Sequence, residues 1–203
     1  MTRAILFDLG GVVLDVDFDR AIHAWGRHSR LPLEQLRAAF HFDDPYQRHE
    51  TGHLEAERYF AHLRELLQLE CGTGPVRAGF NAIFPGEIAQ TVQLLDAVRK
   101  QVPCYAISNT NAVHIEEIQR SFPQLLPRFE RVFTSHEIGY RKPHPAAFQH
   151  VLEAIGVPAA EVLLFDDLEP NVAAARALGM QAVQVRSPAD VRAALEERRL
   201  LFS

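Results

Sequence analysis

Four groups of charged and hydroxyl-bearing residues follow apolar runs in this 203-residue sequence. They are Asp8, Ser108-Asn109-Thr110, Arg141-Lys142-Pro143 and Asp166-Asp167. Clustered carboxylates in a crevice stay ionised only beside a cation, and hard oxygen ligands suit Mg²⁺. Hydroxyl, amide and ammonium donors stabilise the charge of a phosphoryl group, and a carboxylate free of tight metal ligation can attack phosphorus. The chemistry that these residue types indicate is phosphoryl transfer.

Each group also has an ordinary structural interpretation. Asp166-Asp167 suits a turn or the cap of a following helix, and Ser108-Asn109 could cap the next helix. Lys142 could be a surface lysine in a proline turn. The joint position of the groups after successive strands is what favours a shared site.

The elements that would position these residues form an α/β pattern. An apolar run at 4–7 leads into Asp8 and the pair Gly10-Gly11, which is typical of a buried parallel strand ending in a tight turn. Further strands are expected at 102–110, 129–134, 161–167 and 181–185, with helices between them. This alternation predicts right-handed crossovers and a doubly wound parallel sheet, whose strand ends share one edge.

Residues 16–87 show helical periodicity and no strand signal. Helices are expected near 18–27, from Pro32 to about 40, at 55–67 and at 76–83, while Asp43-Asp44-Pro45 is expected to break the chain. We therefore predict a core formed by residues 1–14 and 88–203, carrying a helical insert at 15–87.

Composition limits the classes of partner. The net charge of −5 gives no basic surface for nucleic acid or an anionic membrane, and no apolar run approaches a membrane span. Two cysteines are too few for a disulfide scaffold, and the N-terminus does not resemble a signal peptide. We expect a cytoplasmic monomer or homodimer that binds a small molecule, without nucleic acid or membrane.

The ordered motifs resemble those of the haloacid dehalogenase (HAD)-like hydrolase superfamily, in its phosphatase branch with an α-helical cap. The motifs are Asp8-Leu9-Gly10-Gly11-Val12, Ser108-Asn109, Lys142-Pro143 and Asp166-Asp167-x-x-x-Asn171. Two longer stretches, FDLGGVVLDVDFDRAIHAW and FHFDDPYQRHETG, are similar to the bacterial α-D-glucose-1-phosphate phosphatases. The resemblance implies a Rossmann-like core and a Mg²⁺ cofactor.

The resemblance also implies roles for individual residues. Asp8 would be the nucleophile and a metal ligand, and Gly10 would offer its carbonyl oxygen to the metal. The phosphate would be held by Ser108 and Asn109, and Lys142 would balance the charge of nucleophile and phosphate. Asp167 would ligate Mg²⁺, with Asp166 as a second ligand or acting through a water.

One departure from the resemblance concerns Gly10. Most phosphatases of the superfamily have an aspartate at this position, two residues after the nucleophile, and it protonates the leaving group. Its absence is compatible with a slow phosphatase, with a substrate that has an easier leaving group, or with a replacement acid from elsewhere. A sugar 1-phosphate, which leaves through a more acidic anomeric oxygen, would need that acid less. A cap residue or a water is the hypothesised replacement, and the cap candidates for acid or substrate contact are His41, Asp43, Asp44, Tyr46, Arg48 and His49.

A competing motif is His49-Glu50-Thr51-Gly52-His53, which matches the H-E-x-x-H pattern of zinc metalloproteases. That chemistry needs both histidines on one face of an unbroken helix and a third ligand. Gly52 weakens such a helix, Pro45 lies just upstream, and no third ligand is evident. The zinc interpretation is therefore disfavoured.

The leading functional prediction is a Mg²⁺-dependent phosphatase that hydrolyses a small phosphorylated metabolite through an aspartyl-phosphate on Asp8. A sugar phosphate such as α-D-glucose 1-phosphate is the expected substrate. The first alternative is a metal-free 2-haloacid dehalogenase, which needs no leaving-group proton but gains nothing from paired carboxylates. The second is a non-catalytic relative that binds a phosphorylated ligand or a partner protein.

Overall fold

A computed structural model describes residues 1–201 of the chain. Five parallel strands form one sheet in the order β3-β2-β1-β4-β5. The strands are β1 (Ala4–Phe7), β2 (Cys104–Ser108), β3 (Arg131–Thr134), β4 (Val162–Asp166) and β5 (Gln181–Gln184). The predicted doubly wound α/β sheet is confirmed.

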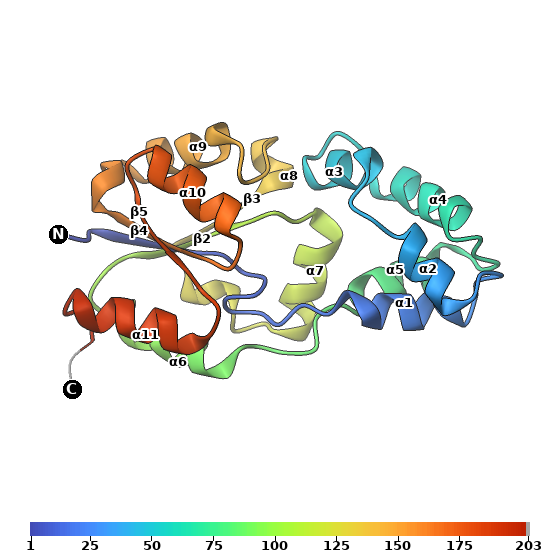
Figure 1. The fold of residues 1–203 in the computed structure, drawn as a ribbon, viewed down its shortest axis with the longest axis horizontal. Coiled ribbons are helices and arrows are strands. Elements are labelled where there is room, and N and C mark those ends of the chain that lie inside the picture. The colour runs from blue at the N-terminus through green and yellow to red at the C-terminus, as the bar shows by residue number, and fades with distance from the viewer. Residues whose placement is uncertain (202–203) are drawn as a thin grey trace.

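Helices cover both faces of this sheet. Figure 1 shows α9 (Pro145–Ile155) and α10 (Glu169–Ala177) on one side, and α6 (Ala89–Val98) and α11 (Pro188–Glu197) on the other. In β1, Ile5 and Phe7 pack into the cluster under α6 and α11, whereas Ala4 and Leu6 pack under α9 and α10. Because both faces are buried, the strand reads as a continuous apolar run rather than an alternating one.

The register of the central strands places the polar residues together. Phe7 pairs with Ala106 of β2 on one side and with Phe165 of β4 on the other. Asp8, which follows Phe7, therefore emerges beside the ends of both neighbouring strands, where Ser108 and Asp166 lie. The carboxyl edge of the sheet is the place where open α/β folds bind ligands.

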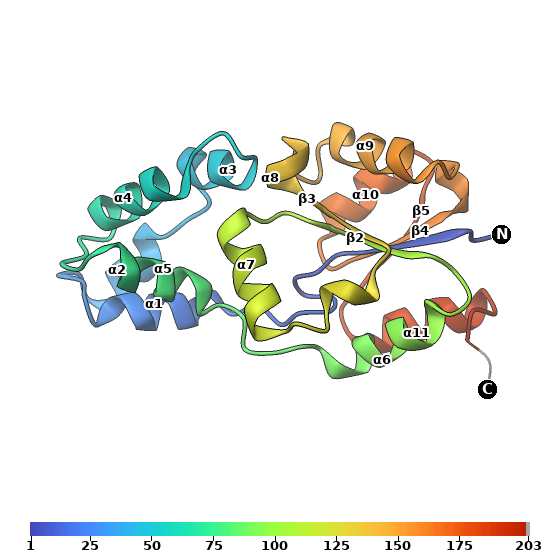
Figure 2. The ribbon, with the colours of Figure 1, turned by 180° about the vertical axis from the view of Figure 1, so that it is seen from behind.

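Five helices lie between β1 and α6 and gather at the end of the molecule away from the termini (Figures 1 and 2). They are α1 (Phe18–Gly26), α2 (Leu33–Ala39), α3 (Asp44–Glu50), α4 (Ala56–Leu66) and α5 (Thr73–Asn81). We call them the insert helices. They share a hydrophobic cluster of their own, which includes Trp25, Tyr59, Phe60 and Phe80. The boundaries 15–87 for a separate cap domain stay a prediction.

Two expectations about local structure are wrong. Asp43-Asp44-Pro45 does not break the chain but begins α3, because the Asp43 carboxylate accepts a hydrogen bond from the Tyr46 amide at 2.9 Å. Pro45 lies in the first helical turn, where no amide donor is needed. The segment after β3, expected as a loop, contains the short helix α8 (Ser135–Ile138).

The remaining elements connect the sheet. Helix α7 (Ala112–Ser121) lies between the sheet and the insert helices, and its His114 ring stacks on Phe80 of α5 at 4.0 Å between centroids (Figure 2). Two 3₁₀ turns, Leu126–Arg128 and Ala159–Glu161, precede β3 and β4. Across residues 1–201, every helix is too short or too polar to cross a lipid bilayer.

The close packing of α1 on α5 generates a stability prediction. A Cβ at Gly79 would lie 2.3 Å from Nε1 of Trp25, which is fully buried and donates to the Val76 carbonyl oxygen. We expect Gly79→Ala to lower the free energy of unfolding by about 1–3 kcal/mol through overpacking. Gly74→Ala, in open space on the same helix, is the control and should be neutral or slightly stabilising. Urea denaturation measures both, and an equal effect of the two changes would contradict the packing argument.

Candidate active site

The edge of the sheet brings together one ammonium and two buried carboxylates. Lys142 Nζ lies 2.7 Å from Asp8 Oδ2 and 2.6 Å from Asp166 Oδ2. The side chain of Lys142 is 1% exposed and that of Asp166 is fully buried, so water screens these contacts little. Segments that are more than 130 residues apart in sequence therefore meet in one ion-paired cluster.

Lys142 is held from two directions. The side-chain amide of Asn109 accepts a hydrogen bond from the Lys142 amide at 2.7 Å and donates to the Lys142 carbonyl oxygen at 2.9 Å. In addition, Lys142 Nζ donates to the Ile107 carbonyl oxygen at 3.2 Å. The Asn109 side chain, predicted to bind phosphate, is thus used to position the lysine-bearing segment.

Three carboxylates form the group that could hold a cation. Asp8, Asp166 and Asp167 each offer an oxygen, and these oxygens lie within 4.8 Å of one another. Asp166 is fixed by Asn171 Nδ2 at 2.8 Å and by the Leu168 amide at 3.0 Å. Asp167 is half-buried at the edge of the cavity. An all-oxygen donor set with three carboxylates fits Mg²⁺.

The cluster shifts the protonation of its own members. Burial, reinforced by Asp166 and Asp167 and opposed by Lys142, raises the pKa of Asp8 to about 8. Burial disfavours the Lys142 ammonium, yet Asp8 and Asp166 outweigh it, so the pKa of Lys142 is raised. Burial and Asp166 likewise raise the pKa of Asp167. One ammonium does not neutralise three carboxylates, and a divalent cation would favour their ionised forms.

The turn after β1 is shaped by Gly11. Its φ of +71° lies in the left-handed region, and a Cβ there would lie 2.5 Å from Asp167 Oδ2. Gly10, by contrast, has an ordinary backbone, and a Cβ would meet only the Val16 side chain at 3.1 Å. The close approach of the Gly11 backbone to the Asp167 carboxylate therefore requires glycine at position 11. No such contact requires glycine at position 10.

A cavity of about 420 Å³ lies between the sheet edge and the insert helices. From the sheet side it is lined by residues that include Asp8, Gly10, Ser108, Asn109 and Asp167. From the insert side it is lined by Phe18, Phe42, Tyr46 and Glu50, and Arg141 also faces it. The cavity thus combines the acidic cluster with a wall of mixed aromatic and charged character.

Of the six predicted cap residues, only Tyr46 lines this cavity. Asp43 caps α3 and bonds His62 Nε2 at 2.7 Å, while His41 and Asp44 are exposed. The His49 ring is buried, stacks on Tyr59 and bonds the Leu54 carbonyl oxygen through Nδ1. These positions do not support His41, Asp43, Asp44 or His49 as the missing acid.

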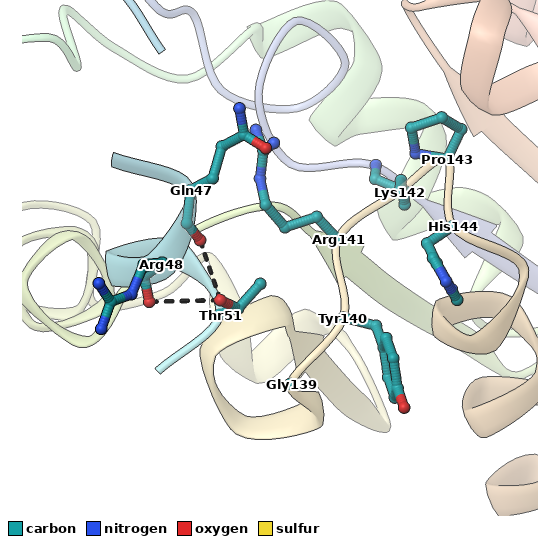
Figure 3. Close-up of a pocket in the computed structure, with 9 residues that line it drawn as sticks. All are labelled: Gln47, Arg48, Thr51, Gly139, Tyr140, Arg141, Lys142, Pro143 and His144. Atoms are coloured by element: carbon teal, nitrogen blue, oxygen red, sulfur yellow. Dashed lines mark hydrogen bonds between the residues drawn. The ribbon is translucent and has the colours of Figure 1, made fainter. Parts of the chain in front are cut away.

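Arg48, the remaining cap candidate, lies beside a neighbouring pocket of about 510 Å³. Figure 3 shows its side chain pointing away from Arg141 and Lys142. In the same view the Thr51 hydroxyl donates to the Gln47 carbonyl oxygen at the end of α3. Arg48 thus lines the neighbouring pocket and does not line the cavity beside the acidic cluster.

Two residues that line the cavity were given no role of their own by the sequence, although Arg141 stands in one of the polar groups it singled out. Glu50 is buried at the end of α3, and its Oε2 accepts a hydrogen bond from Arg141 Nε at 2.6 Å. Arg141 stands next to Lys142 in sequence, and Glu50 falls inside the H-E-x-x-H pentapeptide. The adjacency to Lys142 was an available signal, but only tertiary contact pairs the two residues.

The zinc interpretation of that pentapeptide fails on backbone geometry. Helix α3 ends at Glu50, and Gly52 has a φ of +73°. His53 is exposed outside the helix and bonds the Thr51 hydroxyl, whereas His49 is buried. The two histidines therefore do not share a helical face.

A doubly wound sheet with an ion-paired aspartate after its first strand and an acidic cluster at its carboxyl edge defines a class of hydrolases. The family model described as haloacid dehalogenase-like hydrolase matches residues 2–179. The chain belongs to this family, as the sequence motifs predicted.

Several curated relatives cover nearly the whole chain. The chain is 25% identical to a D-ribitol-5-phosphate phosphatase from Bacteroides thetaiotaomicron, over 95% of this chain and 96% of that protein. It is 26% identical to hexitol phosphatase A from Escherichia coli, over 93% and 85% of the two chains. The expected place of the chain among HAD-like enzymes with phosphatase relatives is confirmed.

A solved HAD-family enzyme from Bacteroides thetaiotaomicron, in complex with magnesium and inorganic phosphate, has a TM-score of 0.82 and 25% identity. The match covers 92% of this chain and 95% of that one. An L-2-haloacid dehalogenase from Xanthobacter autotrophicus has the same fold, with a TM-score of 0.65 and 21% identity over 91% and 78% of the chains. The expectation of Mg²⁺ agrees with the first neighbour and with the acidic cluster described above.

The raised pKa of Asp8 generates a prediction about metal binding. Metal ligation needs the carboxylate, so below pH about 8 the ion must displace a proton, and this cost disappears as the pH rises through that value. We expect 10 mM Mg²⁺ to raise the thermal unfolding midpoint more at pH 8.5 than at pH 6. Differential scanning calorimetry measures the shift. Asp167→Asn should reduce it, and an equal shift at both pH values would contradict the argument.

The contact of Gly11 with Asp167 generates a second prediction. In Gly11→Ala the new Cβ would push the Asp167 carboxylate away, and we expect Mg²⁺ affinity to fall about 10–100-fold. Gly156→Ala is a matched control, because it has a φ of +65° but open space around it. Both variants lose stability from left-handed strain, but only Gly11→Ala should weaken the metal, as measured by isothermal titration calorimetry. Equal affinities in the two variants would contradict the role of Gly11.

Proposed function

We propose that this protein is a Mg²⁺-dependent phosphatase that hydrolyses a small phosphorylated polyol or sugar. The observation that carries the proposal is the buried Asp8–Lys142–Asp166 cluster, with Asp167 beside it, at the cavity between the sheet edge and the insert helices. This set supplies a nucleophile, a fixed positive charge and oxygen ligands for a hard cation. The phosphatase relatives support the same reaction class.

In this mechanism Asp8 attacks phosphorus and forms an aspartyl-phosphate, which water then hydrolyses. Lys142, which contacts Asp8, balances charge on the nucleophile and on the bound phosphate. Ser108 and the backbone at Asn109 lie in the cavity wall and bind phosphate oxygens. Asp8, Asp167, Asp166 and the Gly10 carbonyl oxygen would hold Mg²⁺, which when bound neutralises phosphoryl charge.

The substrate class follows from the cavity and the relatives together. The cavity volume of about 420 Å³ suits a small metabolite, and the side chains of Tyr46, Glu50 and Arg141 offer polar groups to the hydroxyls of a substrate. Relatives named for ribitol 5-phosphate and hexitol phosphates favour a polyol or sugar phosphate. The sequence resemblance to the α-D-glucose-1-phosphate phosphatases makes α-D-glucose 1-phosphate the first individual substrate to test.

A metal-free dehalogenase is disfavoured by the charge of the site. Asp166 and Asp167 add two carboxylates beside Asp8, and they would repel a haloacid anion unless a cation were bound. The likeness to haloacid dehalogenases establishes the fold alone.

The proposal predicts the behaviour of an Asp8→Asn variant. An amide cannot form the acyl-phosphate, so we expect p-nitrophenyl phosphate hydrolysis to fall at least about 10³-fold. Asp44→Asn, an exposed change on α3, should keep full activity. EDTA should abolish wild-type activity and added Mg²⁺ should restore it. Undiminished turnover by Asp8→Asn, or turnover insensitive to EDTA, would overturn the mechanism. A panel of polyol and sugar phosphates then ranks the substrates.

A further inference from the structure

The leaving group of the proposed reaction lacks an obvious proton donor. Gly10 occupies the position where the family resemblance leads us to expect an acid, and the predicted replacements His41, Asp43, Asp44 and His49 do not line the cavity. The backbone at Gly10 would accept a side chain with only a small shift of Val16. Backbone strain therefore does not explain the glycine, and an alkyl phosphate still needs a proton for its departing oxygen.

Among the described residues, the carboxyl groups that line the cavity are Asp8, Asp15, Glu50 and Asp167. Asp8 and Asp167 belong to the acidic cluster. Asp15 is exposed at the start of the insert. Glu50 is the one that is buried, reaches the cavity from the insert side and stands apart from the acidic cluster. When the phosphoryl group is transferred in line to Asp8, the leaving group lies opposite Asp8 and projects away from the sheet, toward that side.

Glu50 is held in place by both halves of the structure. Arg141 Nε donates to Oε2 at 2.6 Å, and the Tyr46 hydroxyl lies near enough to the carboxyl group to lower its pKa. Ser135 Oγ donates to the Glu50 carbonyl oxygen at 2.6 Å, which fixes the end of α3 against the sheet. A catalytic acid needs this kind of fixed position.

The charged and titratable groups around Glu50 act in opposite directions. Burial raises the pKa of Glu50, and Arg141, the Tyr46 hydroxyl and Lys142 oppose this shift without reversing it. Tyr59 also faces it and stays neutral, since burial raises its own pKa. A bound phosphate ester would add negative charge nearby and favour the protonated carboxyl further.

We propose that Glu50 is the general acid and base of this active site, replacing the aspartate that Gly10 lacks. As Asp8 Oδ bonds to phosphorus and the phosphorus–oxygen bond to the alcohol breaks, the Glu50 carboxyl proton passes to the departing oxygen. The products are the free alcohol, the aspartyl-phosphate and the Glu50 carboxylate. This inference rests on the proposed phosphatase function.

The second half of the reaction restores the enzyme. The Glu50 carboxylate accepts a proton from a water that attacks phosphorus, and the bond between phosphorus and Asp8 breaks. Inorganic phosphate leaves, Asp8 returns as a carboxylate and Glu50 is again protonated. Arg141 and Tyr46 act as positioning residues that keep the Glu50 carboxyl directed at the cavity.

The dependence of kcat/KM on the leaving group distinguishes a proton-donating Glu50 from a Glu50 that only forms a structural ion pair with Arg141. The p-nitrophenolate ion leaves without a proton, whereas a primary alkoxide does not. We expect Glu50→Gln to lower kcat/KM for the best primary polyol phosphate about 10²–10⁴-fold, and to lower that for p-nitrophenyl phosphate less than about 10-fold. Glu57→Gln, an exposed change of the same kind on α4, should alter neither.

A measurement on the wild-type protein keeps the test independent of folding in the variant. The ratio of kcat/KM for the alkyl ester to that for the aryl ester cancels the ionisation of Asp8, which both reactions share. Above pH about 7, where both esters are dianions, the ratio should fall with rising pH, because the fraction of Glu50 that still carries its proton decreases. A ratio that is constant with pH would overturn the proposal.

The outcomes distinguish this inference from the function on which it rests. If the wild-type protein hydrolyses neither ester, the proposed phosphatase function fails. If it hydrolyses both but Glu50→Gln lowers both equally, or neither, Glu50 is not the proton donor and the phosphatase function stands. Selective loss with the alkyl ester, together with a falling ratio in the wild type, supports Glu50.

Discussion

The buried Lys142 ammonium, shared between Asp8 and Asp166, is the interaction on which the site depends. An unpaired charge at this depth would be costly, and the paired carboxylates would repel each other without the lysine. The arrangement therefore needs the ends of β1 and β4 and the loop that carries Lys142 to meet at one place. Asn109 supports it by fixing the Lys142 backbone with two hydrogen bonds. The cluster still carries more negative than positive charge, and a bound cation would balance it.

The insert helices complete the site through α3. The end of this helix is fastened to the sheet by the Ser135–Glu50 hydrogen bond and by the ion pair between Arg141 and Glu50. Phe42 and Tyr46 from the same region form the cavity wall. In the proposed reaction the sheet edge would supply the groups that act on phosphorus, and the insert would supply the groups that face the rest of the substrate.

The order of strands and helices was readable from the sequence because buried parallel strands are short apolar runs, and β1, β2 and β4 each end in the polar residues that give the site. Asp8, Ser108, Lys142 and Asp166 were therefore predicted together. The errors arose where one local signal had two meanings. Asp43-Asp44-Pro45 was taken as a break, although an aspartate cap followed by proline also begins a helix, as it does in α3.

The sequence by itself determined the fold class, the acidic and basic residues at the sheet edge and the absence of an acid at Gly10, because these depend on local periodicity and on residue identity. Only the tertiary structure decided three other features. It pairs Glu50 with Arg141, uses the Asn109 side-chain amide to hold Lys142, and packs the His49 ring against Tyr59. Each of these depends on which surface of a short helix or loop is turned toward a distant segment. That orientation is set by the packing of the whole insert against the sheet, and no short stretch of sequence encodes it.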